Sequence, residues 1–123
     1  MPEFVVHEHK AKKLHWDLRL ELDGVLASWA VPKEPPREPS VKRLAIKVED
    51  HPLDYKDFEG EIPEGSYGAG TVKIWDRGEY FIMNRSDDKL EIVMNGRVLR
   101  GRYVLLKFDR GGKDSWLFFK ARD

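Results

Sequence analysis

The chain has 123 residues and no cysteine, and its 22 lysines and arginines balance its 22 aspartates and glutamates. This length is enough for one domain with a buried core, and the lack of cysteine excludes disulfides and thiolate metal sites. Zero net charge excludes a uniformly basic protein that coats nucleic acid. Because there is neither a membrane-length apolar run nor a signal peptide, we expect a cytoplasmic protein. We also expect a single domain over residues 1–123 and a monomer.

The N-terminal half of the chain alternates strand patterns with turn signals. We predict strands at residues 4–7, 14–22, 25–31 and 43–49. Asp23 and Gly24 lie between two of these runs and predict a tight hairpin, because glycine tolerates the positive φ that such a turn needs. Four prolines predict a loop at residues 32–39. Residues 50–70 predict a longer loop with a short helical turn near residues 53–58.

The C-terminal half continues in the same way. We predict strands at residues 71–75, 79–84, 89–94, 97–108 and 115–121. An Asp-Arg-Gly sequence at residues 76–78 predicts a turn, Asn95 and Gly96 predict a second hairpin, and Gly101 predicts a bulge or bend. About eight short strands without a three-turn amphipathic helix indicate an all-β fold. We favour a small antiparallel β-barrel with little helix and a polar crevice.

Charge is unevenly distributed along the chain despite the zero total. Residues 49–64 contain seven acidic residues and a single base, Lys56. Residues 97–123 contain eight basic residues and three acidic ones. A compact fold could gather the C-terminal bases into a local positive surface, which is the usual electrostatic signature of nucleic-acid binding.

The predicted strand at residues 14–22 has an unusual polar face. Its apolar face carries leucines and Trp16, and its other face carries, in order, His15, Asp17, Arg19 and Glu21. Side chains two residues apart on a strand leave the same face, with Cα atoms roughly 6–7 Å apart. His15 and Asp17 could therefore meet on one metal ion. They could equally form a hydrogen-bonded pair on a hydrated surface.

His9 could complete a metal site with His15 and Asp17. On a straight strand His9 would lie about 20 Å from His15, so the polar segment at residues 10–13 must bend the chain to bring it back. Two imidazoles and one carboxylate with open positions fit a catalytic divalent metal. Arg19, one step further along the face, fits a bidentate grip on phosphate, or an ion pair with Asp17 or Glu21.

Further candidates lie outside this strand. They are Lys33, Arg43, Glu49, His51 and Tyr55. His51 follows the end of a predicted strand, where loops often carry function, although an ordinary surface histidine fits equally well. Glu49 could orient His51, and Lys33 and Tyr55 could donate to phosphate; each also fits a solvated residue. The glycine-rich stretch at residues 60–70 lacks the Gly-Lys-Ser/Thr ending of a phosphate-binding loop, so we attribute it to backbone geometry.

Longer stretches of the chain resemble a known family. The segment FVVHEHKAKKLHWDLRLELDGVLASWAVPK is similar to the opening of the 3′-phosphoesterase domain of bacterial and archaeal DNA ligase D. That family shows a His, five residues, and then His-aromatic-Asp-x-Arg-Leu-Glu. The resemblance continues through EDHPLDYKDFEGEIPEGSYGAGTVKIWDRGEY, GRVLRGRYVLLKF and WLFFKARD, which together cover nearly the whole chain. These stretches include no ligase or polymerase region, so we expect a minimal stand-alone form.

The resemblance implies a small β-barrel enzyme that repairs the 3′ ends of DNA or of DNA/RNA primer-templates. It implies removal of a terminal ribonucleoside to leave a 3′-phosphate, followed by hydrolysis of that phosphate to a 3′-hydroxyl, with Mn²⁺ preferred and Zn²⁺ or Co²⁺ as alternatives. By matching position, the metal ligands are His9, His15 and Asp17. The implied phosphate-contacting residues are Arg19, Arg43, His51 and Tyr55, together with Lys33, whose role is less defined, and Glu49 and Glu21 are in supporting roles. The implied partners are a separately encoded DNA ligase and primase-polymerase.

Two other interpretations fit the residues. A non-catalytic module could bind nucleic-acid ends or a repair partner through the basic C-terminal region. A metal-dependent hydrolase of small phosphoesters could use the same histidines and aspartate. The proteins would differ in turnover and in their preference for duplex ends.

Overall fold

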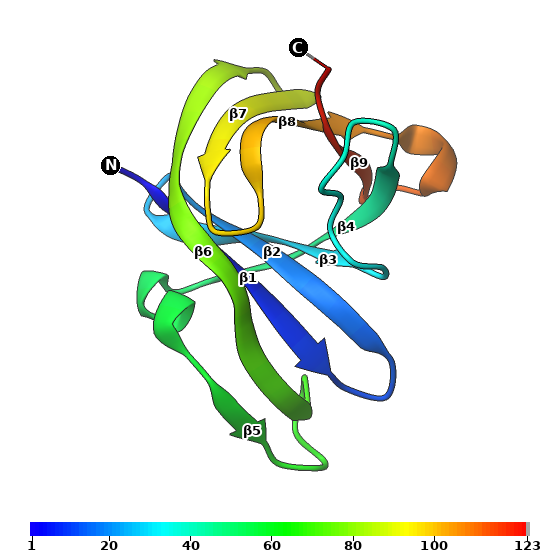
Figure 1. The fold of residues 1–123 in the computed structure, drawn as a ribbon. Coiled ribbons are helices and arrows are strands. Elements are labelled where there is room, and N and C mark those ends of the chain that lie inside the picture. The colour runs from blue at the N-terminus through cyan, green and yellow to red at the C-terminus, as the bar shows by residue number, and fades with distance from the viewer. Residues whose placement is uncertain (123) are drawn as a thin grey trace.

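The computed structural model describes residues 1–122, and nearly all of its regular structure is β-strand (Figure 1). The strands are β1 (Glu3–Lys10), β2 (Leu14–Leu22), β3 (Val25–Val31), β4 (Lys42–His51), β5 (Gly60–Ile62), β6 (Gly70–Arg85), β7 (Lys89–Asn95), β8 (Arg100–Lys107) and β9 (Ser115–Lys120). Two short 3₁₀ helices, η1 (Leu53–Asp57) and η2 (Asp109–Gly111), complete the regular structure of this part of the chain. Within residues 1–122, no helix is long and apolar enough to cross a membrane.

The strands form one antiparallel sheet that closes on itself. Neighbouring strands follow the order β1-β2-β3-β4-β9-β8-β7-β6, and β6 pairs again with β1. The short strand β5 pairs with the beginning of β6. In Figure 1, β6 runs from the lower end of the molecule to the top, and it pairs first with β1 and later with β7. The predicted all-β antiparallel barrel is confirmed, and closure leaves few free strand edges.

Two hairpins at the start of the chain build the wall that carries the candidate site. The predicted bounds of the strands at 14–22 and 25–31 are confirmed, and both Asp23 and Gly24 have the positive φ of a tight primed turn. β1 is longer than predicted, since it continues to Lys10 and only residues 11–13 turn the chain. His9 pairs directly with His15 across this hairpin. The predicted bend that brings His9 back beside His15 is therefore also confirmed.

The predicted turn at residues 76–78 is wrong, because β6 passes through these residues as one continuous strand. Gly78 allows a close backbone approach: a Cβ there would lie 2.2 Å from the carbonyl oxygen of Asn95. The buried carboxylate of Asp76 accepts hydrogen bonds from two backbone N–H groups of the β7–β8 loop. These residues resemble a turn in sequence, but they hold a neighbouring loop in place.

The β7–β8 connection also differs in detail from the prediction. The hairpin is present, but residues 96–99 form a four-residue loop in which the Gly96 N–H donates to the Leu99 carbonyl at 3.0 Å, and β8 begins only at Arg100. Gly96 is required for space, since a Cβ would lie 2.4 Å from an Asp76 carboxylate oxygen. Gly101 has a φ of +110°, as expected for a bend inside a strand.

The interior of the barrel is apolar. Alternate residues of β1, β2 and β3 point inward and join residues of the other strands in one buried cluster that includes Phe4, Val6, Leu18, Leu20, Ala27, Trp29, Val31, Tyr80, Ile92, Tyr103 and Phe118. Full burial of each large apolar side chain contributes about 1.5–3 kcal/mol before the entropy cost of ordering the chain. This cluster makes the β1–β2–β3 wall a firm support for whatever its outer face carries.

The outer face of the same wall is covered by the segment of residues 52–69, which contains η1 and β5. Val5 and Leu26 belong to this outer face and are nevertheless 0 % exposed. The covering segment is attached through its backbone, because the carbonyls of Phe58 and Gly68 accept hydrogen bonds from histidines of β1. A partly enclosed crevice therefore lies between the barrel wall and this segment. The predicted helical turn near residues 53–58 is confirmed as η1.

Candidate active site

A hollow of about 280 Å³ lies in this crevice on the outer face of the barrel. It is lined by side chains from β1, β2, β3, β4, η1 and the covering loop, namely His9, Ala11, His15, Asp17, Arg19, Ala30, Val48, His51, Tyr55, Ile62, Tyr67 and Gly68. Six of the residues singled out from the sequence are in this list. The structure therefore brings the predicted metal-ligand set and much of the predicted phosphate-contacting set to one place.

His9, His15 and Asp17 form a cluster in the hollow that could hold a metal ion, and we call it the metal-ligand cluster. Each offers one ligand atom, and these atoms all lie within 4.8 Å of one another. His15 Nε2 is 3.3 Å from Asp17 Oδ1, and His9 Nδ1 is 3.6 Å from Asp17 Oδ2. The arrangement follows from the register, because His9 and His15 are cross-strand partners and Asp17 is two residues further along the same face.

Backbone hydrogen bonds fix which ring nitrogen each histidine presents. His9 Nε2 is 2.8 Å from the Gly68 carbonyl oxygen, and His15 Nδ1 is 3.2 Å from the Lys13 carbonyl oxygen. A carbonyl can only accept, so these nitrogens carry protons and donate. When the rings are neutral, His9 Nδ1 and His15 Nε2 are the unprotonated nitrogens, and both face the Asp17 carboxylate. Metal-binding histidines are commonly oriented in this way, so the three side chains fit a divalent cation.

The charges around Asp17 keep its carboxylate ionised. Burial alone would raise its pKa, but the hydrogen bond with His15 and the positive charge of Arg19 outweigh burial, so the pKa of Asp17 is lowered. His15 donates this hydrogen bond only when Nε2 carries a proton, so the bond raises the pKa of His15. A proton and a metal ion therefore compete for the imidazole of His15.

Arg19 connects the metal-ligand cluster to the other half of the hollow. Its guanidinium donates from Nη2 to Asp17 Oδ2 at 3.3 Å and from Nη1 to Ser28 Oγ at 2.9 Å. Nη1 also lies 3.2 Å from His51 Nδ1, and Nε donates to His7 Nδ1 at 3.0 Å. The side chain is 4 % exposed, so its position is fixed by these partners. Arg19 thus forms the ion pair with Asp17 that the sequence left open as the alternative to phosphate binding.

His51 and Tyr55 form the side of the hollow opposite the metal-ligand cluster. Their rings stack with centroids 4.7 Å apart, and the Arg19 guanidinium lies 5.0 Å from the centre of the Tyr55 ring. Burial and the nearby Arg19 lower the pKa of His51, and burial raises the pKa of Tyr55. Near neutral pH both side chains are therefore uncharged in the absence of a bound anion. His51 Nδ1 also lies 3.1 Å from the Glu49 carbonyl oxygen.

His7 and Ser28 belong to this network, and sequence reasoning missed both. His7 is 0 % exposed; its Nε2–H donates to the Phe58 carbonyl at 3.0 Å, and its Nδ1 accepts from Arg19. Burial and the charge of Arg19 lower the pKa of His7 to about 4, so the ring is neutral. The sequence did contain a signal, because residues two apart on one strand share a face and His7 precedes His9 by two.

The remaining predicted residues lie elsewhere. Arg43 donates from Nε to the Glu34 carbonyl at 2.7 Å, and it lines a separate hollow together with Lys33. Neither residue lines the hollow that contains Arg19. Glu49 is exposed and meets the site through its backbone carbonyl. The Glu21 carboxylate pairs with Lys56 Nζ at 2.7 Å, away from Arg19, which agrees with a role in the fold.

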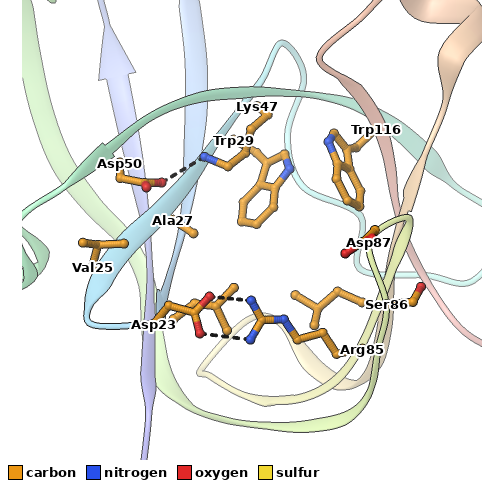
Figure 2. Close-up of a pocket in the computed structure, with 12 residues that line it drawn as sticks. Asp23, Val25, Ala27, Trp29, Lys47, Asp50, Arg85, Ser86, Asp87 and Trp116 are labelled. Carbon is orange, nitrogen blue, oxygen red and sulfur yellow. Dashed lines mark hydrogen bonds and ion pairs between the residues drawn. The ribbon is translucent and has the colours of Figure 1, made fainter.

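A larger hollow of about 710 Å³ lies away from these residues (Figure 2). Figure 2 shows the Trp29 and Trp116 rings projecting into it opposite the Asp23–Arg85 ion pair. Its two cations are already neutralised, Arg85 by Asp23 and Lys47 by Asp50. It contains no histidine. The chemistry therefore favours the smaller hollow as the functional site.

Comparison with known proteins identifies the family of the chain. Residues 7–107 match the family model described as the DNA Ligase D 3′-phosphoesterase domain. The chain is 51% identical to a multifunctional non-homologous end joining protein LigD of Pseudomonas aeruginosa over 98% of its own length and 15% of the relative's. It is 49% and 44% identical to LigD proteins of Mycobacterium tuberculosis and Mycolicibacterium smegmatis, again over 98% of the chain. The chain spans between 15% and 17% of these relatives. It belongs to the DNA ligase D 3′-phosphoesterase domain family.

Proposed function

We propose that this protein is a metal-dependent phosphoesterase that repairs the 3′ ends of DNA strands. One observation carries the proposal: the three residues of the metal-ligand cluster line the same hollow as the Arg19 guanidinium, which contacts His51. Phosphoester hydrolysis needs both parts, because the negative phosphate oxygens repel a nucleophile until their charge is balanced. Family membership supports the same reaction class.

His9, His15 and Asp17 would hold the divalent cation. Two neutral imidazole nitrogens and one carboxylate oxygen suit Mn²⁺, with Zn²⁺ and Co²⁺ as alternatives, and we propose Mn²⁺ as the working ion. When bound, the ion supplies Lewis-acid activation of the phosphate and of water. The protein's own contribution is to present the ligand atoms in fixed tautomers on a rigid strand pair.

Arg19 would bind the non-bridging phosphate oxygens with N–H groups that do not already donate to Asp17, Ser28 or His7. It stands between the cation site and His51, so a phosphate held by Arg19 would face both. His51 would either donate a proton to the departing 3′-oxygen or stabilise the negative charge of the phosphate. The two roles differ in their pH dependence, because a proton donor must be protonated before the bond to the leaving group breaks. Tyr55 stacks on His51 and keeps its ring in place.

Two reactions would follow one another at this site. The first removes a terminal ribonucleoside and leaves a 3′-phosphate; it requires the 2′-hydroxyl, which distinguishes RNA from DNA at that position. In the second, water cleaves the 3′-phosphate to give a 3′-hydroxyl and inorganic phosphate. The product is the end that a DNA ligase or a polymerase extends. We propose that DNA or DNA/RNA primer-template ends are the substrates, in the cytoplasm, during end joining of the kind named for the relatives.

The direct test is to incubate the protein with Mn²⁺ and a primer-template that ends in a 3′-phosphate or in one ribonucleotide. We expect conversion to a 3′-hydroxyl, with a 3′-phosphate intermediate from the ribonucleotide substrate, and no reaction in chelator. Absence of a 3′-hydroxyl product with Mn²⁺, Zn²⁺ and Co²⁺ would contradict the proposal. Nucleoside monophosphates serve as the comparison, because equal turnover of these would indicate a general small-phosphoester hydrolase.

One observation favours a second candidate, a non-catalytic module that binds nucleic-acid ends. A hollow of about 360 Å³ beside β8 and β9 is lined by several basic residues, namely Lys42, Lys89, Arg102, Lys120 and Arg122, with Glu91 as its acidic member. This agrees with the charge excess expected after residue 97. Tight, salt-dependent DNA binding without metal or turnover would support this function over the first.

A further inference from the structure

Tyr67 is an exposed aromatic residue at the rim of the candidate site. Its side chain lines the same hollow as His9, His15 and Asp17, yet the residue is 86 % exposed. No aromatic contact, hydrogen bond or ion pair engages its side chain within residues 1–122. A single exposed apolar residue needs no explanation by itself. One that borders a catalytic hollow and leaves its ring free can contact a ligand.

The backbone holds Tyr67 in this position. Gly65 and Gly68 both have positive φ, and two turn hydrogen bonds, from Ser66 N–H to the Pro63 carbonyl and from Ala69 N–H to the Ser66 carbonyl, shape the loop between them. The next residue, Gly68, accepts the hydrogen bond from His9 Nε2 at 2.8 Å. The Tyr67 ring is therefore carried by a loop that is attached directly to one of the proposed metal ligands.

The charge beside this loop favours a polyanionic partner. Lys10, Lys12 and Lys13 are all exposed at the tip of the β1–β2 hairpin, and no described residue forms an ion pair with them. Lys10 and Lys12 line a hollow together with Glu64, Gly65, Ala69 and Gly70 of the Tyr67 loop, so one carboxylate accompanies the two lysines. A strand whose end enters the site could thus pass lysines that contact its phosphates and an aromatic ring that contacts a base.

We infer that Tyr67 stacks on the base of the 3′-terminal nucleotide of the substrate strand and thereby favours ends that carry a base over phosphoesters that lack one. This inference rests on the proposed function, which places the terminal phosphate in the hollow beside Arg19. Every base has an aromatic face, so stacking would add affinity without selecting a sequence. The effect belongs to substrate binding, because the ring is at the rim of the hollow and away from the reacting bond.

The experiment compares two primer-templates that end in a 3′-phosphate and differ only at the terminal nucleotide, which either carries a base or is abasic. Tyr67→Ala should raise KM and the dissociation constant about five-fold to 100-fold for the base-carrying end and leave kcat unchanged. On the abasic end the variant and the unchanged protein should behave alike. Tyr67→Trp should keep the affinity of the unchanged protein, because its ring also stacks.

Phe81→Ala is the matched control, since Phe81 is also an exposed aromatic residue but does not line the hollow. Phe81→Ala should leave KM and the dissociation constant unchanged for both substrates. Equal losses on both substrates with Tyr67→Ala would show that the residue only supports the loop, and unchanged values would show that it makes no contact; either result overturns the inference. Equilibrium binding is measured by fluorescence anisotropy without turnover. If the protein hydrolyses neither substrate, the proposed function fails while the binding comparison still tests stacking.

Discussion

In the middle of β2 both faces are buried, but they carry different kinds of side chain. On the inner face, Leu18 and Leu20 are 0 % exposed and pack in the apolar core. On the outer face, Asp17 and Arg19 are 5 % and 4 % exposed, yet both are charged and satisfied by other polar groups. Burying ions costs free energy that an apolar pair would not. The inner face therefore stabilises the barrel. That stability offsets the cost of holding the charged side chains of the outer face in a buried, fixed arrangement.

The largest expected effect is on catalysis and comes from the outer face. His15→Ala removes one proposed metal ligand, and loss of the several kcal/mol that a metal ion supplies corresponds to a roughly 1000-fold fall in kcat/KM. His15 is only half-buried, so the melting temperature of the metal-free protein should change little. The measurement is a Mn²⁺-dependent 3′-phosphatase assay together with thermal unfolding. Arg85→Ala, which breaks an exposed ion pair far from the hollow, is the control. Near-normal turnover in His15→Ala would show that His15 is not a metal ligand.

The inner face should show the reverse behaviour. Leu18→Ala leaves a cavity in the core and should lower the free energy of unfolding by about 2–5 kcal/mol. Activity per folded molecule should remain near normal at low temperature, because Leu18 points away from the hollow. Urea unfolding and the phosphatase assay measure the two quantities. A large loss of kcat with little loss of stability would show that the two faces are not separable in this way.

A smaller effect concerns pH and His7. The folded protein holds the pKa of His7 at about 4, below its unfolded value of 6.5, so the unfolded state binds more protons between these values. The free energy of unfolding should therefore fall as pH drops from about 6.5 to about 4, by up to about 1.4 kcal/mol per pH unit from this group.

His7→Gln should reduce that slope, because glutamine also offers a donor and an acceptor but does not titrate. Urea unfolding at several pH values, in the presence of a chelator, measures how the free energy of unfolding depends on pH for the variant and for the unchanged protein. Identical slopes would mean that His7 is not held neutral by its burial.

The smallest effect should come from Glu21, at the end of the outer face. Its carboxylate pairs with the partly exposed Lys56, so Glu21→Gln should cost less than about 1 kcal/mol of stability. Activity should be unchanged, since Glu21 does not line the hollow. Chemical unfolding and steady-state kinetics test both parts. A loss of more than ten-fold in kcat would place Glu21 in the catalytic machinery instead.

Much of the wall and of the site could be predicted from the sequence. Strict alternation located β2 and its polar face, and the Asp23–Gly24 pair located the β2–β3 hairpin. The need to return His9 to His15 located the first turn. These features are local, because strand period and turn chemistry are set by residues close together in the chain.

The rest could not be predicted, because it depends on contacts between distant segments. His7 meets the Phe58 carbonyl across 51 residues, and nothing near His7 in sequence shows that pairing. Asp76 looks like part of a turn until the β7–β8 loop is placed beside it. Arg43 and His51 share β4 but are eight residues apart, which is roughly 26 Å on an extended strand, so one small hollow does not contain both side chains.

The central claim, that the outer face of the β1–β2 hairpin is a metal site, is tested most directly by anomalous scattering from crystals soaked with Mn²⁺ and phosphate. The account predicts one strong manganese peak within bonding distance of His9 Nδ1, His15 Nε2 and an Asp17 carboxylate oxygen, with phosphate between it and Arg19. Manganese bound elsewhere, or phosphate seated away from Arg19 and His51, would contradict it.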